Sequence, residues 1–142
     1  MSDMYSRSLS FLQLSNDAIG RIADDDANLD TACFCPQQAL ELLIKFILQQ
    51  CNIPFGKTHN IRELLQDFDK LPFAFSKAED LDILADTITS WEQSGRYGKG
   101  IQTTVKTIKR VHNVFMSLNT AYLDWQQSMQ QQDMNPDKIN LN

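Results

Sequence analysis

The sequence contains few of the residues that form disulfide frameworks, metal sites and membrane spans. It has 3 cysteines and 2 histidines in 142 residues, and no set of them has the spacing of a zinc finger. An odd number of cysteines, with Cys33 and Cys35 in or beside an apolar segment, indicates reduced thiols that pack in a core. No window of about 18 uninterrupted apolar residues exists, and residues 1–17 lack the apolar centre of an export signal. We therefore expect a soluble, cytoplasmic protein with no membrane contact, metal site or cofactor.

Acidic residues are missing from one long internal stretch. The net charge of −5 argues against a general polyanion binder, and we expect no DNA partner. No acid lies between Glu92 and Asp124, however, and five of the thirteen cations fall in this gap. They are Arg96, Lys99, Lys106, Lys109 and Arg110. Such a basic run is usually a solvated face; the functional alternative is a local anion site for phosphate groups.

Strand-like alternation is absent, and apolar residues recur every three or four positions, as they do in helices. Helices are predicted over residues 4–24, in a second segment that ends by Asn52, over 61–68, between Ser76 and Gly95, and over 101–129. The second helix either begins near Asp30 and bends at Pro36, or begins with Pro36 in its first turn. Its neighbours are expected to bury apolar faces that include Phe11, Leu14, Ala18 and Ile22 in the first helix and Leu81, Leu84, Ala85, Ile88 and Trp91 in the fourth. The stripe of the last helix comprises Ile101, Val105, Ile108, His112, Phe115, Leu118, Tyr122, Trp125 and Met129.

Long amphipathic helices joined by short loops predict the fold class and the domain organisation. The class is all-α, an up-and-down antiparallel bundle of about five helices. Residues 1–129 form this single domain, and residues 130–142 form a polar, disordered tail.

The bundle is organised around the segment from Pro36 to Leu48, which is apolar on almost every side of a helix. Gln38, Glu41 and Lys45 are three and four residues apart, so they share one narrow polar stripe. Glu41 precedes Lys45 at the spacing that favours an ion pair. The stripe is either this internal ion pair, which is the commoner case, or the floor of a groove.

Other candidate residues are the histidines and one arginine–tyrosine pair. Gly56-Lys57-Thr58 lacks the glycine and the preceding strand of a phosphate loop. His112 lies on the apolar stripe of the last helix, which favours a buried histidine with a hydrogen-bond partner over a catalytic base. His59 precedes a helix and either makes local hydrogen bonds, which we favour, or contacts a phosphate or base. Arg96 and Tyr97 suit a nucleotide, through phosphate and base respectively, and equally suit a structural role.

The order of these motifs resembles the HEPN domain, a small α-helical module. The resemblance covers roughly residues 8–125. Its motifs are Gln38-Ala39-x-Glu41-x-x-x-Lys45, then Pro54, Thr58-His59 and Leu64-Leu65, then Arg96-Tyr97. It implies a bundle of about five helices that often dimerises and works beside minimal nucleotidyltransferases as a nucleotide- or substrate-binding partner. In some branches it implies a metal-independent RNase of a toxin–antitoxin pair.

Three positions depart from the family pattern. The RNase branches carry an arginine, four to six residues and then a histidine, whereas here Arg110 precedes His112 by only two residues. Glycine replaces the proline that follows Arg96-Tyr97, and Leu42 replaces a lysine beside Glu41.

These observations lead to one main functional hypothesis and two alternatives. The main hypothesis is a non-enzymatic, homodimeric domain that binds a nucleotide or other phosphorylated ligand and partners a nucleotidyltransferase-like protein. Its ligand-binding residues are Gln38, Glu41, Lys45, His59, Arg96 and Tyr97. The alternatives are an RNase toxin that pairs Arg96 or Arg110 with His112, and a protein–protein adaptor.

Overall fold

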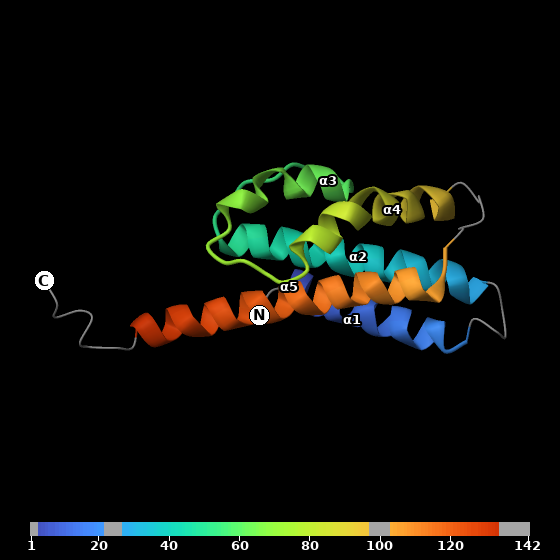
Figure 1. Cartoon of the computed structure of the whole chain (residues 1–142), viewed down its shortest axis with the longest axis horizontal. Coiled ribbons are helices and arrows are strands. Elements are labelled where there is room, and N and C mark those ends of the chain that lie inside the picture. The colour runs from blue at the N-terminus through green and yellow to red at the C-terminus, as the bar shows by residue number, and fades with distance from the viewer. Residues whose placement is uncertain (1–2, 22–26, 97–102, 134–142) are drawn as a thin grey trace, which may run out of the picture.

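The computed structural model describes residues 3–21, 27–96 and 103–133. Its elements are α1 (Asp3–Ile19), α2 (Ala27–Gln50), α3 (Ile61–Leu64), the 3-10 helix η1 (Leu65–Lys70), α4 (Ala78–Arg96) and α5 (Val105–Asp133). Successive long helices run in opposite directions along one long axis (Figure 1). α2 packs against α1, α4 and α5, and no strand occurs in the described residues. The predicted all-α bundle is confirmed.

α2 occupies the centre because its sequence buries almost every side. Ala39, Leu40, Leu43, Ile44 and Ile47 have no exposed surface. The ring of Phe46 lies 5.1 Å from that of Tyr5 and 5.4 Å from that of Tyr122, measured between centroids, which joins α2 to α1 and α5. The segment Asn28–Gln50 is long and apolar enough to cross a membrane, but 72% of its apolar window is buried inside the bundle. This is the burial expected of a core helix.

α2 begins at Ala27 and runs through Pro36, which decides between the two predicted starts. Proline has no N–H, so the carbonyl of Ala32, four residues earlier, loses its usual helical donor. The hydroxyl of Ser15 on α1 donates to that carbonyl at 2.7 Å. The same hydroxyl oxygen lies 2.8 Å from Nε2 of His112 on α5, so one serine joins three helices.

The predicted buried face of α1 was partly wrong. Leu14 was expected in the core but is 51% exposed, whereas Ala18 is buried as predicted. The fully buried positions include two serines, Ser8 and Ser15, whose hydroxyls bond to the Tyr5 and Ala32 carbonyls. Small side chains with satisfied hydroxyls allow α1 to approach α2 closely, which rotates Leu14 outward. α1 ends at Ile19 and residues 20–21 form a turn, so the predicted helix over 4–24 is shorter than expected. Residues 22–24, with the predicted core residue Ile22, lie outside the described residues.

The connection from α2 to α3 reverses the chain through Asn52, which has φ 57°. The Ile53 N–H donates to the Leu48 carbonyl at 2.9 Å, and the Asn52 N–H donates to Gln49, which is the Schellman arrangement of a helix end. Asn60 then caps α3 by accepting from the Glu63 N–H at 3.2 Å. The predicted helix over 61–68 is an α-helical turn followed by a 3-10 helix, because Asp67 has non-helical angles.

The last two helices agree closely with the sequence pattern. The five apolar positions predicted for α4 are all buried. In α5 four of the nine predicted positions are buried, and Val105, His112 and Trp125 are half-buried. Met129 was expected in the core but is 42% exposed, because the last turns of α5 extend beyond the other helices (Figure 1). Ile101 lies outside the described residues. α5 continues to Asp133, four residues beyond the predicted boundary, because its glutamines are good helix formers. Residues 134–142 of the predicted tail lie outside the described residues.

Candidate functional site

The candidate site is centred on the carboxylate of Glu41, which is only 3% exposed. Its Oε1 accepts from Nζ of Lys45 at 2.9 Å and lies 2.7 Å from Nδ1 of His59. Its Oε2 accepts from Nε2 of Gln37 at 3.0 Å. A buried carboxylate is tolerated only when it is paired in this way, because desolvation of an unpaired charge is costly. The Glu41–Lys45 ion pair expected from the spacing is present.

Gln37 was missed by the sequence analysis. It is fully buried, and its Oε1 accepts from Nε2 of Gln38 at 2.9 Å, so a chain of hydrogen bonds runs from Gln38 through Gln37 to Glu41. Its spacing of four residues before Glu41 was the available signal.

His59 reaches Glu41 because the end of the 53–60 connection is fixed against α4. The backbone N–H of Ile61 donates to Oγ1 of Thr89 on α4 at 3.1 Å. Thr58 bonds through its hydroxyl to Glu63 and accepts from the Asn60 N–H. These bonds hold both residues that flank His59, so its ring is presented from a fixed backbone.

The two ring nitrogens of His59 have different surroundings. Nδ1 carries the proton in the bond to Glu41, because a carboxylate only accepts. Nε2 has no hydrogen-bond partner among the described residues, and the side chain is 62% exposed. Nε2 therefore faces solvent as an acceptor on a neutral ring or as a donor on a protonated one. Only the donor form suits a phosphate oxygen.

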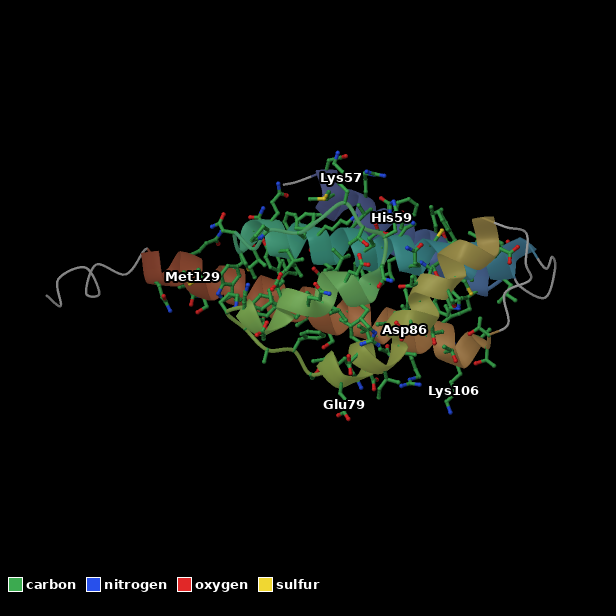
Figure 2. All side chains as sticks on the ribbon, turned by 90° about the horizontal axis from the view of Figure 1, so that it is seen from above. Lys57, His59, Glu79, Asp86, Lys106 and Met129 are labelled. Carbon is green, nitrogen blue, oxygen red and sulfur yellow. The ribbon has the colours of Figure 1, made fainter. Side chains whose placement is uncertain are left out.

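A pocket of about 450 Å³ lies between the 54–58 loop and the α3–η1 segment. Phe55 and Lys57 contribute to its wall, and Thr58 connects it in sequence to His59. Its volume falls in the range of small-ligand sites. Lys57 and His59 lie near one edge of the molecule, and Lys106 lies near the opposite edge (Figure 2). Lys106 of the basic stretch thus does not converge with His59.

The other two predicted site residues fall at the limit of the structure. Arg96 is the last residue of α4, seven residues beyond Thr89, which corresponds to roughly 10 Å along the helix. Tyr97 lies outside the described residues. Four of the six predicted residues, Gln38, Glu41, Lys45 and His59, therefore share one hydrogen-bonded network.

A family model for the HEPN domain matches residues 1–124. The chain belongs to the HEPN family. No curated protein and no solved structure matches it. The match confirms the family indicated by the motifs and spans every predicted site residue of this HEPN domain.

The nearest arginine to His59 in sequence is engaged elsewhere. Arg62 donates from Nε to Asp86 and from Nη1 to Asp82, both at 3.0 Å. Hydrogen bonds to Asp86 and Asp82 raise the pKa of Arg62. These pairs attach α3 to α4, and Arg62 therefore does not pair with Glu41, which bonds to Lys45 and His59.

The second histidine of this HEPN domain has a structural partner. His112 is half-buried, and burial, with a smaller effect from Lys109, lowers its pKa. Since the Ser15 hydroxyl donates to Ala32, it accepts from Nε2–H of His112. Arg110 faces Asp80 at 3.5 Å. His112 thus has the hydrogen-bond partner that the favoured interpretation expected, although it is half-buried and not fully buried.

The thiols are poorly suited to nucleophilic chemistry. Burial raises the pKa of all three, that of Cys33 to about 12 with a further contribution from Asp30. Thiols with raised pKa values are poor nucleophiles near neutral pH. Among the described residues, no group of three or more histidine, cysteine or acidic side chains could hold a metal ion.

Proposed function

We propose that this HEPN domain binds a nucleotide or another phosphorylated ligand at the Glu41 network, in the cytoplasm and without catalysing a reaction. The observation that supports this most strongly is the His59–Glu41–Lys45 cluster. A buried carboxylate fixes Nζ of Lys45 and the ring of His59, which come from separate segments, and leaves Nε2 of His59 open to solvent.

Each residue then has a defined role in recognition. Protonated His59 donates from Nε2 to a phosphate oxygen, while Lys45 balances the charge of Glu41 so that the anion is not repelled. The pocket at the 54–58 loop, with Phe55 in its wall, receives the remainder of the ligand. The family motif assigns Arg96 and Tyr97 to the same ligand, through phosphate contact and base stacking.

Titration calorimetry with a panel of nucleoside mono-, di- and triphosphates tests this proposal. We expect His59→Ala to weaken binding by about tenfold or more, because it removes a charge-assisted hydrogen bond. Its side chain is exposed, so the variant should retain its fold. Lys106→Ala, at the opposite edge of the molecule, is the matched control and should bind as the wild type does.

The site assignment fails if no nucleotide binds at millimolar concentration. It also fails if His59→Ala and Arg96→Ala both bind as tightly as the wild type.

We further propose that the domain is a homodimer and partners a nucleotidyltransferase-like protein. Family membership supports both, and exposed Leu9, Leu14 and Phe34 provide apolar surface for association. Light scattering after size exclusion tests the dimer. Co-purification with a nucleotidyltransferase encoded beside this gene tests the partner.

The RNase alternative receives less support. His112 is bonded to Ser15, Arg110 faces Asp80, and the two-residue spacing differs from that of RNase branches. Growth arrest on expression, abolished by His112→Ala in a folded protein, would favour the RNase and contradict the binding-only proposal.

A further inference from the structure

A second recess, remote from Glu41 in sequence, lies where the η1–α4 connection meets the middle of α5. In Figure 1 this connection runs down toward α5, whose C-terminal turns continue beyond the other helices. The groove has a volume of about 620 Å³. Its α5 side spans Met116 to Ser128 at helical spacing, about 18 Å along the axis.

The groove is built from fixed side chains. The ring of Phe73 lies 5.7 Å from that of Trp125, measured between centroids, and Phe75 packs edge-on against Phe68 at 6.1 Å. The hydroxyl of Ser76 is 3.0 Å from that of Ser117, which ties the connection to α5. The aromatic walls are therefore held in place before any partner arrives.

The charge that lines the groove is negative. None of its eleven lining residues is lysine or arginine, and one, Asp124, is acidic. Asp124 is exposed and forms no ion pair with any residue in the described ranges. The faces of Phe73 and Trp125 carry negative electrostatic potential as well, so carboxylate and rings favour the same kind of ligand. A phosphate would be repelled here, which separates this groove from the Glu41 site.

We propose that the groove binds a short segment of another protein in which a lysine or arginine stands beside apolar residues. The cationic group pairs with Asp124 and stacks on Trp125, and the apolar neighbours cover Phe75 and Met116. Met116 is 51% exposed at the groove, so apolar surface remains to be covered. The length of the groove suits an extended segment of about five or six residues.

Selection from a random heptapeptide display library tests the proposal without assuming a partner. Against the wild-type chain we expect enrichment of lysine or arginine next to apolar residues. Against Asp124→Lys the enrichment of basic residues should disappear and acidic residues should replace them. Because Asp124 is exposed and has no ion-pair partner among the described residues, this variant should retain the fold.

The peptide recovered most often is then measured by fluorescence anisotropy. We expect Asp124→Asn to weaken its binding by about threefold to fivefold, the loss of an exposed ion pair, and higher salt to weaken binding by the wild type more than binding by the variant. Glu79→Gln is the matched control, since Glu79 is an exposed acid on α4 that does not line the groove.

Four outcomes would overturn the proposal. They are recovery of no common peptide, enrichment of acidic residues on the wild type, equal losses of affinity in Asp124→Asn and Glu79→Gln, and a wild-type dimer that Asp124→Lys dissociates. In the last case the occupant is a second copy. None of these results depends on nucleotide binding, so the two proposals stand or fall separately.

Discussion

We predict that removal of the Ser15 hydroxyl lowers the stability of the fold strongly, because this hydroxyl makes two hydrogen bonds. Ser15 is fully buried, donates to the Ala32 carbonyl at 2.7 Å and accepts from His112 at 2.8 Å. Ser15→Ala leaves both partners unpaired. An unsatisfied buried polar group costs about 1–3 kcal/mol, so we expect the free energy of unfolding to fall by about 2–4 kcal/mol. Urea denaturation followed by circular dichroism at the helical band measures it.

Ser10→Ala is the matched control on the same helix. The Ser10 hydroxyl bonds to the Ser6 carbonyl at 3.1 Å but is exposed, so water replaces the bond. We expect a change within about 0.5 kcal/mol.

The substitution Pro36→Ala separates the cost of the unpaired Ala32 carbonyl from the cost of the unpaired His112. The new N–H at position 36 can donate to the Ala32 carbonyl, so that carbonyl no longer depends on Ser15. In this background Ser15→Ala should cost about 1 kcal/mol less than in the wild type, the difference being a coupling energy. The explanation is refuted if Ser15→Ala costs under about 0.5 kcal/mol, or costs the same in both backgrounds.

Two further predictions concern acid stability and the end of α2. Because the pKa of His112 is lowered in the folded chain, the unfolded chain binds a proton more readily, and stability present above the ordinary histidine pKa is lost as pH falls below it. The unfolding free energy should therefore drop less between about pH 7 and about pH 5 in His112→Gln than in the wild type; equal slopes would contradict this. Asn52, with φ 57°, should tolerate glycine, with a gain of about 0.5 kcal/mol, whereas alanine should cost about 1 kcal/mol in thermal or urea unfolding. An alanine variant as stable as the glycine variant would show that the left-handed backbone is not strained.

The fold could be predicted where burial follows hydrophobicity. α4 has a simple apolar stripe, and all five predicted positions are buried. The face of α1 was misjudged because Ser8 and Ser15 lie in the core, and a serine gives no hydropathy signal for burial. The passage of α2 through Pro36 depends on a donor 21 residues earlier, which local sequence rules do not include.

Only the part of the candidate site that follows from helical spacing could be predicted from the sequence. Glu41 and Lys45 are one helical turn apart, so their ion pair follows from spacing alone. The bond from His59 to Glu41 joins residues 18 apart and requires α3 to be fixed on α4. The motif order placed His59 in the site, but only the folded chain gives it a partner and an open nitrogen.

The hydrogen bonds that attach α1 to its neighbours fix its position along their axes. Its buried contacts include the Tyr5 hydroxyl donating to Asn119 at 2.9 Å and, more than half of the helix length away, the two bonds of Ser15. Dispersion contacts between leucines change little when one helix slides by a turn past another, whereas hydrogen bonds are directional and break. We therefore expect α1 to have a single register on its neighbours and to detach as a whole, without intermediate positions.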